Sequence, residues 1–489
     1  MTLAKKIGYN TLIHTIGKFI GSALGLVIIG LLTRYLGTAG YGFYTTIFAY
    51  LFFFSTIGDL GLYLVTINEL GRTSVDQKTF FSNIFTIRFS SGIVLMLLAG
   101  VLIWFFPYPY LVKIGTLIIS LSVFLMMVDQ IVVALFQAKM KTKYVALAEI
   151  IGKMIVLGLT ILVIQMDLGF LPVLWTVVAG LVVHFLINIF YARKILPFKF
   201  AFNPEIWQKI FKKSWPVATY MVFSMIYFKA DTIILSLYHP QSVVGLYGAP
   251  YKMLEVLIVF PAIFMGLVSP HLSSAFSKNN LINFKKYFQT AFDFLSIVIW
   301  PLILGTIVLA EPLMNFIAGK NFLLSAPILQ ILIVATGIIF IAHLSTFAVV
   351  ACGKQKEMMK FYILAALMAL FLYFTLIPNY SYYAAALITV SIELFILIAS
   401  WLMVKKTTKI KISFKNNLKS LLGSLVMAAV LYLTDLSLII SVVGGAIIYI
   451  ILIYFLGIFK KDILKDFLIK NNQTYIRNYE RNYVYHLNI

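Results

Sequence analysis

The chain has 489 residues, of which 62% are hydrophobic and only 11% are charged, and its mean hydropathy is +0.98. This apolar content exceeds what a soluble core of this length needs, so it excludes a soluble enzyme, a coiled coil and a disordered chain. The single cysteine, Cys352, excludes a disulfide framework and a multi-cysteine metal site. The composition therefore predicts an all-α polytopic membrane protein.

The apolar segments predict about fourteen transmembrane helices, because each is long enough to cross a hydrocarbon layer about 30 Å thick. In chain order they cover 13–33, 41–66, 80–106, 112–137, 146–165, 172–192, 215–238, 243–271, 287–310, 327–350, 361–377, 383–403, 419–433 and 438–457. We expect an N-terminal lobe with spans 1–6 (1–192), a basic linker (193–214), a C-terminal lobe with spans 7–12 (215–404), spans 13–14 (405–457) and a basic tail (458–489).

The net charge of +22 follows the predicted topology. Lys and Arg gather in the N-terminus, the tail and alternate connections, and the connections of the opposite side hold only Arg34, Lys113 and Lys320. Cytoplasmic loops carry such an excess, so both termini are predicted to be cytoplasmic. The basic surplus then indicates topology and contact with anionic lipids, and disfavours nucleic acid as a partner.

Two segments of the chain echo each other. The sequence GTAGYGFYTTIFAY (37–50) opens the second span, and QSVVGLYGAPYKML (241–254) opens the eighth. A parallel repeat of six spans would place a substrate site and a central cavity between two lobes. Chance similarity between apolar segments is the alternative.

Ionisable residues inside spans are costly, so each is a candidate for function. Glu149 with Lys153, and Lys252 with Glu255, have the spacing to neutralise each other on one helix face. Lys229 lies deep and has no such partner, so it needs a carboxylate on another helix or a cavity that holds an anion.

The surroundings of two other lysines suggest where a cavity lies. Lys18 falls within the stripe of Gly17, Gly21 and Gly25, whose commoner meaning is close helix packing. The span that contains Lys252 also contains three prolines, which predict kinks beside a cavity or a moving element. They are Pro250, Pro261 and Pro270.

Two further segments carry a family resemblance. Residues 33–71 (TRYLGTAGYGFYTTIFAYLFFFSTIGDLGLYLVTINELG) and 229–272 (KADTIILSLYHPQSVVGLYGAPYKMLEVLIVFPAIFMGLVSPHL) resemble the polysaccharide transporters. These are oligosaccharide flippases, similar to O-antigen flippases, of the multidrug/oligosaccharidyl-lipid/polysaccharide exporter superfamily. The resemblance implies a flippase for a polyprenyl-(pyro)phosphate-linked oligosaccharide, with a central cavity lined by cationic side chains.

The resemblance and the charges together give the candidate residues. The expected substrate ligands are Lys18, Arg88, Lys229 and Lys252. Candidates for H⁺ or Na⁺ coupling are Asp59, Asp129, Asp231 and Glu393, for which a structural role is the alternative. No catalytic residue, metal site or cofactor is predicted.

The sequence therefore predicts an alternating-access flippase of the cytoplasmic membrane that serves surface polysaccharide biosynthesis. Expected partners are the lipid-linked oligosaccharide, membrane lipids and, further, a polysaccharide polymerase and glycosyltransferases. A cation-coupled exporter of drugs or small metabolites on the same scaffold is the alternative. A membrane polymerase or transferase is disfavoured because the chain lacks a large external loop for acceptor chemistry.

Overall fold

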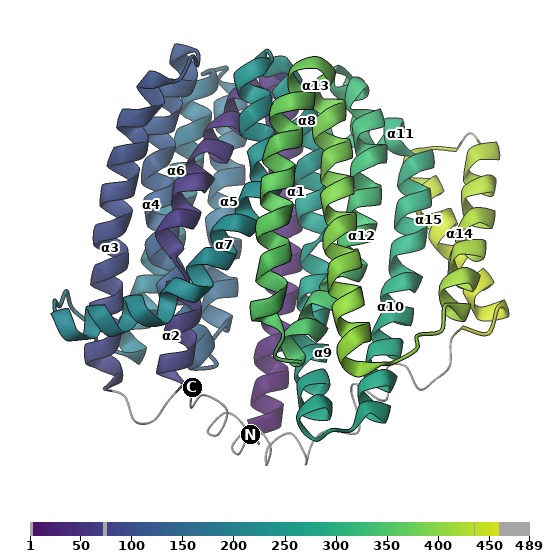
Figure 1. Cartoon of the computed structure of the whole chain (residues 1–489). Coiled ribbons are helices and arrows are strands. Elements are labelled where there is room, and N and C mark those ends of the chain that lie inside the picture. The colour runs from purple at the N-terminus through teal and green to yellow at the C-terminus, as the bar shows by residue number, and fades with distance from the viewer. Residues whose placement is uncertain (1–2, 72–75, 435, 459–489) are drawn as a thin grey trace.

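The computed structural model describes residues 3–71, 76–434 and 436–458, and all regular structure in these ranges is helical (Figure 1). The predicted tail, apart from Ile458, lies outside the described residues. The helices are α1 (Leu3–Asp59), α2 (Leu62–Leu70), α3 (Gln77–Leu102), η1 (Ile103–Phe105), α4 (Tyr110–Ala138), α5 (Lys143–Gln165), α6 (Phe170–Ile195), α7 (Pro204–Tyr238), α8 (Gln241–Leu257), α9 (Val259–Ser277), α10 (Leu281–Val308), α11 (Ala310–Ala318), η2 (Lys320–Ser325), α12 (Ala326–Ala351), α13 (Gln355–Thr408), α14 (Lys415–Leu433) and α15 (Leu438–Phe455).

The helices stand side by side in one bundle, with α1 through its middle, α3 at one edge, and α14 and α15 at the other (Figure 1). Eleven helical segments of the described chain are long and apolar enough to cross a membrane. This confirms the predicted all-α polytopic membrane fold.

Two of these segments cross twice. α1 has a non-helical residue at Gly37 (φ 64°, ψ −174°), and α13 has one at Ser381 (φ 55°, ψ −140°). Each helix rises from the lower face in Figure 1, turns at the upper face and returns. If the two kinked helices each cross twice and α7 crosses once more, the eleven segments correspond to about fourteen spans, the predicted number. The last helix, α15, ends near the start of α14, where the ammonium group of Lys419 donates to the carbonyl oxygen of Leu456 (2.5 Å).

The proline-rich eighth span is broken, as predicted. α8 ends at Leu257, and α9 begins at Val259 after the single residue Ile258. Pro261 has no N–H to donate to the carbonyl of Leu257, four residues earlier, so the helical ladder is interrupted there. Ile258 lines a cavity, which places the break beside it.

Glycines set the closest helix contacts. A methyl group on Gly17 would lie 2.5 Å from the Cβ of Ala146, and one on Gly21 would lie 2.7 Å from the carboxylate of Glu149. The glycine stripe thus packs α1 against α5, which confirms its packing role.

The two echoing segments also lie against each other, where α1 crosses α8. A methyl on Gly42 would approach the carbonyl oxygen of Gln241 to 1.7 Å, and one on Gly245 would approach that of Thr38 to 1.9 Å. The hydroxyl of Thr46 donates to the side-chain oxygen of Gln241 (2.6 Å). Backbones can approach this closely only where both residues lack a side chain.

The connection between α6 and α7 is shorter than the predicted linker. Since Arg193 and Lys194 belong to α6 and Asn203 caps α7, only residues 196–203 separate the two helices. The connection runs along α3, whose side chains of Ser82, Thr86 and Asn83 accept hydrogen bonds from the backbone N–H groups of Lys199, Ala201 and Asn203 (3.3, 2.9 and 2.8 Å). These bonds fix the connection to α3.

A polar seam joins α14 to α10. The carboxylate of Asp293 accepts hydrogen bonds from Gln289 and Asn416 (2.8 Å each). One turn further along α10, Ser296 accepts a hydrogen bond from Asn417 (2.9 Å). The predicted final pair of spans is therefore attached by partly buried hydrogen bonds as well as by apolar contacts.

Candidate substrate-binding site

Two cavities adjoin each other in the interior of the bundle. The larger, of about 680 Å³, is lined by Lys18, Lys153 and Lys252 and is called the cationic cavity below. The smaller, of about 450 Å³, is called the aromatic cavity because Phe52, Tyr227, Phe228, Phe347 and Tyr362 line it. Asp59 and Gln130 line both cavities, so the two meet at these residues.

On one side of the cationic cavity, Glu149 of α5 holds two lysines. Its carboxylate lies 3.3 Å from the ammonium groups of both Lys18, on α1, and Lys153, one turn along α5. Lys153 also donates to the carbonyl oxygen of Gly21 (2.8 Å). The predicted pairing of Glu149 with Lys153 is confirmed, and Lys18 is an additional partner from another helix. These three residues are called the Glu149 cluster.

A second carboxylate, Glu255 of α8, also holds two lysines. It lies 2.7 Å from Lys252 and forms an ion pair with Lys229 of α7. The partner on another helix that Lys229 requires is therefore Glu255. The side chain of Lys252 is 49% exposed and lines the cationic cavity, whereas that of Lys229 is 14% exposed and packs 4.5 Å from the ring centre of Tyr251. These three residues are called the Glu255 cluster.

Each of the two clusters has an excess of positive charge, and the lining of the cationic cavity also contains the carboxylates of Asp59 and Asp129. Each contains two lysines and one carboxylate, so each carries a formal charge of about +1 at neutral pH. Within a cluster, the shared carboxylate lowers the cost of burying the lysines without cancelling both charges. An anionic group that enters the cavity can therefore contact lysines that come from α1, α5 and α8.

Arg88 occupies a different place from the other predicted ligands. Its guanidinium is fully buried, donates to the carbonyl oxygen of Met127 (2.7 Å) and to the side chain of Gln130 (2.6 Å), and lies 3.8 Å from Asp59. Arg88 lines neither of the two cavities. It fixes Asp59 and Gln130, the two residues at which the cavities meet.

The four predicted coupling acids fall into different surroundings. Asp129 lines the cationic cavity, where Asn188 donates to it (2.9 Å) and His184 lies 3.1 Å away. Asp231 is fully buried and accepts hydrogen bonds from Tyr247 (2.6 Å) and from the backbone N–H of Thr232 (2.5 Å).

The other two acids line the aromatic cavity. Asp59 lies beside Arg88, but its Oδ1 atom has no hydrogen bond within the described chain. Glu393 is 6% exposed, and no ion pair or hydrogen bond to it is found among the described residues. Both carboxylates therefore retain capacity to accept hydrogen bonds from a ligand.

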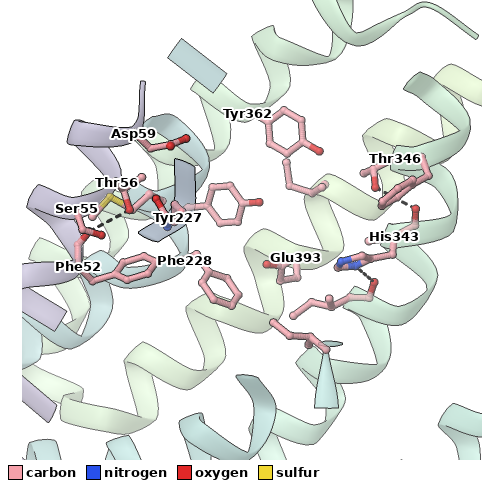
Figure 2. Close-up of a pocket in the computed structure, with 17 residues that line it drawn as sticks. Phe52, Ser55, Thr56, Asp59, Tyr227, Phe228, His343, Thr346, Tyr362 and Glu393 are labelled. Atoms are coloured by element: carbon pink, nitrogen blue, oxygen red, sulfur yellow. Dashed lines mark hydrogen bonds between the residues drawn. The ribbon is translucent and has the colours of Figure 1, made fainter. Parts of the chain in front are cut away.

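Figure 2 shows how the aromatic cavity is built. Phe52, Ser55, Thr56 and Asp59 from α1 face His343, Thr346, Tyr362 and Glu393 from α12 and α13, and Tyr227 and Phe228 from α7 lie between them. Sequence reasoning missed this second cavity. Most of its residues come from five helices far apart in the chain, and only Asp59 and Glu393 were visible as charges inside spans.

The part of the chain that the structure describes contains no candidate metal site. Among the described residues, no group of three or more His, Cys, Asp and Glu side chains could hold a metal ion. The arrangement instead suits the binding of a ligand that has an anionic portion and a portion that stacks on aromatic rings and donates hydrogen bonds.

Comparisons with known proteins show the family and the fold of the chain. A family model described as "Polysaccharide biosynthesis protein" matches residues 7–276, more than half of the chain. No curated protein sequence matches the chain.

Solved structures share the fold. The lipid II flippase MurJ, in an inward closed conformation, is similar with a TM-score of 0.73 and 20% identity over 91% of this chain and 98% of that one. An inward-facing multidrug resistance transporter of the MATE family has a TM-score of 0.66 and 11% identity over 82% and 98%. The MATE transporter VcmN of Vibrio cholerae, in its bent form, has a TM-score of 0.59 and 13% identity over 86% and 99%.

Proposed function

The chain belongs to the polysaccharide biosynthesis protein family, and on this premise we propose that it is a flippase for lipid-linked oligosaccharides. It would move a polyprenyl-(pyro)phosphate-linked oligosaccharide from the inner to the outer leaflet of the cytoplasmic membrane. No covalent chemistry is needed for this step. The polymerase and glycosyltransferases that use and supply such a substrate are its proposed functional partners.

The observation that carries this proposal is the pair of lysine clusters at one cavity. A pyrophosphate must cross a layer of low dielectric constant, and lysine donors lower that cost through charge-assisted hydrogen bonds to phosphate oxygens. Lys18 and Lys252 are 39% and 49% exposed, and both line the cationic cavity. Lys229 supports the site by pairing with Glu255, which leaves Lys252 partly available to the substrate.

Transport would proceed by alternating access between two lobes, helices α1–α6 and α7–α13. We propose that the lower face in Figure 1 is cytoplasmic, because the connections of that face carry the excess of Lys and Arg. Coupling to H⁺ or Na⁺ stays a prediction. Asp59 and Asp129 are the candidates that line the cationic cavity, whereas Asp231 lines neither cavity.

The alternative, a cation-coupled drug exporter, draws on the shared fold of the MATE transporters. The lining of the cationic cavity holds three lysines and three carboxylates, so the attraction for an anion comes from the two clusters, each of which sets two lysines against one carboxylate. The excess of lysine within these two clusters therefore favours the flippase.

Transport in sealed proteoliposomes tests the proposal. A fluorescent polyprenyl-pyrophosphate oligosaccharide is incorporated, and the accessibility of its headgroup is followed with the wild-type protein, with empty liposomes and with Lys252→Ala. Protein-dependent movement that Lys252→Ala slows at least about tenfold supports the flippase and its cationic site. If folded wild-type protein moves no substrate under any imposed ion gradient, the proposal fails.

A further inference from the structure

We propose that residues 196–215, called the α7 arm below, form a binding surface for the headgroups of anionic phospholipids. The arm comprises the connection after α6 and the first part of α7. An excess of Lys and Arg by itself indicates only which side of the membrane is cytoplasmic. The structure adds an arrangement in which one flank of a helix carries aromatic side chains and the opposite flank carries lysines. This inference goes beyond the proposed transport and does not depend on it.

The α7 arm lies across the bundle near its lower face. In Figure 1 the first part of α7 runs across α3, and the helix then turns upward into the bundle. The backbone N–H of Asn203 and the ring N–H of Trp207 both donate to the side chain of Asn83, in the second turn of α3 (2.8 and 3.2 Å). The ammonium group of Lys213 forms an ion pair with Glu69 of α2 (3.0 Å). These contacts hold the arm close to the end at which α3 enters the membrane.

One face of the arm is occupied by packing. Ile206 and Ile210, one turn apart, pack into an apolar cluster that includes Phe81 of α3. Ser214, a further turn along, is buried as well. Residues four apart on a helix share a face, so these positions mark the side of α7 that faces the bundle. The two flanks of the helix remain available for other contacts.

The first flank of the arm is aromatic and exposed. Phe211 and Trp215 are four residues apart, and the side chain of Trp215 is 70% exposed. In the connection before α7, Phe200 and Phe202 are exposed too. Aromatic rings of this kind are favoured at the boundary between the headgroups and the acyl chains. The flank therefore fits a position at which its rings enter the membrane.

The opposite flank carries lysines. Lys209 and Phe211 point about 200° apart around the helix axis, whereas Lys212 points only about 60° from Lys209. Both lysines are exposed, and neither forms an ion pair within the described chain. The acidic residue of the arm, Glu205, lies in the first turn of α7, where a carboxylate interacts favourably with the helix N-terminus. The ammonium groups of the two lysines are thus available to a ligand.

The two flanks together identify that ligand. A helix that lies in the interface places its apolar side chains among acyl chains and its lysines among headgroup phosphates. Anionic lipids give the cytoplasmic leaflet a negative potential that attracts lysines beside the membrane. Exposed basic side chains continue toward α6 at Lys199, Lys194 and Arg193. A free phosphate ion would leave the aromatic flank uncovered, so the surface fits a phospholipid with a net negative charge.

Thermal unfolding in detergent tests the binding. Phosphatidylglycerol is added to the full-length protein, with phosphatidylcholine of the same acyl chains and glycerophosphoglycerol, the soluble headgroup, as references. We expect phosphatidylglycerol to raise the melting temperature by several degrees more than either reference. Equal shifts with the two lipids would overturn the preference for negative charge. An equal shift with the soluble headgroup would overturn the role of the aromatic flank.

Paired substitutions locate the effect on the arm. Lys209→Gln with Lys212→Gln should remove more than half of the difference between the two lipids. Lys405→Gln with Lys406→Gln, at the end of α13, removes the same charge from exposed positions and should keep most of that difference. Each variant is compared with its own lipid-free melting temperature, so a change in basal stability does not count. Equal losses for the two pairs would overturn the arm as a particular site.

Fluorophores on the two flanks test the orientation of the arm. In a Cys352→Ala background, Phe211→Cys and Lys209→Cys are labelled in proteoliposomes that contain phosphatidylglycerol. Lipids with a nitroxide on the acyl chain should quench the label at position 211, and iodide on both sides of the membrane should quench the label at position 209. If iodide quenches both labels equally, the arm stands away from the membrane and the proposal is wrong. Neither measurement involves transport, so a failure here would leave the flippase proposal untouched.

Discussion

Gly42 of α1 and Gly245 of α8 lie backbone to backbone, because a methyl group on either would come within 2 Å of a carbonyl oxygen of the opposite helix. The two glycines belong to the two segments whose sequences echo each other. They form the closest contact described above between the first six spans and the spans that follow. Below this crossing, toward Asp59 and Glu255, the two helices contribute to the cavities.

We expect Gly245→Ala to destabilise the protein strongly, since backbone atoms must move to accommodate the methyl group. Overpacking of this kind costs about 1–3 kcal/mol or more. The melting temperature of the detergent-solubilised protein measures the effect. Gly158→Ala is the matched control, because a methyl group there meets nothing within 4 Å and alanine favours the helix. Equal melting temperatures for the two variants would contradict the close contact.

Arg34 attaches α11 to α1 at the upper face of Figure 1. Its guanidinium donates to the carbonyl oxygens of Ile317 (3.0 Å) and Phe316 (2.5 Å), at the end of α11, where free carbonyls favour a cation. Arg34→Gln should lower the free energy of unfolding by about 1–3 kcal/mol. Lys320→Gln, which removes another cation of this face, should have a smaller effect in the same denaturation measurement. A larger loss with Lys320→Gln would refute the capping role.

The shared carboxylates should matter more for stability than the lysines they hold. Lys252→Ala leaves Glu255 paired with Lys229, whereas Glu255→Gln leaves two lysines without their carboxylate. We expect Glu255→Gln to cost up to about 3 kcal/mol of stability, and Lys252→Ala to cost clearly less while it slows transport. Thermal unfolding and proteoliposome transport of both variants give the comparison. The reverse order of stabilities would show that the cluster is not organised around Glu255.

Arg88 should act through the residues that it positions. Arg88→Lys keeps the charge but cannot donate to Met127 and Gln130 with the geometry of a guanidinium. We therefore expect less folded protein and a lower melting temperature, by several degrees. If Arg88→Lys is fully stable and only weakens substrate binding, Arg88 contacts the substrate directly in another conformation.

The proposed orientation can be read from two cysteine substitutions in a Cys352→Ala background. Lys320 lies after α11 on the upper face, and Lys411 lies between α13 and α14; both are exposed. In intact cells, a membrane-impermeant maleimide should label Lys320→Cys, and should label Lys411→Cys only after permeabilisation. The opposite pattern would invert the assigned topology.

The sequence predicted those parts of the structure that depend on local chemistry. Apolar length predicted the membrane fold, glycine spacing predicted a close helix contact without its partner, which is α5, and Pro261 lies beside the observed break at Ile258. The spacing of Lys252 and Glu255 likewise predicted their ion pair. Each of these features depends on residues that are neighbours in the chain.

The features that were missed depend on contacts between distant segments. Lys18 reaches Glu149 across two helices that are separated by more than 100 residues, and Gln130 becomes important only because Arg88 holds it at the junction of the cavities. The aromatic cavity gave no signal in the sequence, because most Phe and Tyr residues of a membrane protein face lipid or its interface. Whether Lys18, Arg88, Lys229 and Lys252 contact substrate stays a prediction.

The polar seam on α10 bears on how far the chain can be shortened. A protein cut after Thr408 would retain Asp293 and Ser296 but lose Asn416 and Asn417, which donate to them. Of its donors within the described chain, Asp293 would keep only Gln289, and the buried polar face of α10 would lose the helix that covers it. The final two helices therefore cover a polar face of α10, and a twelve-span version of this protein would expose it.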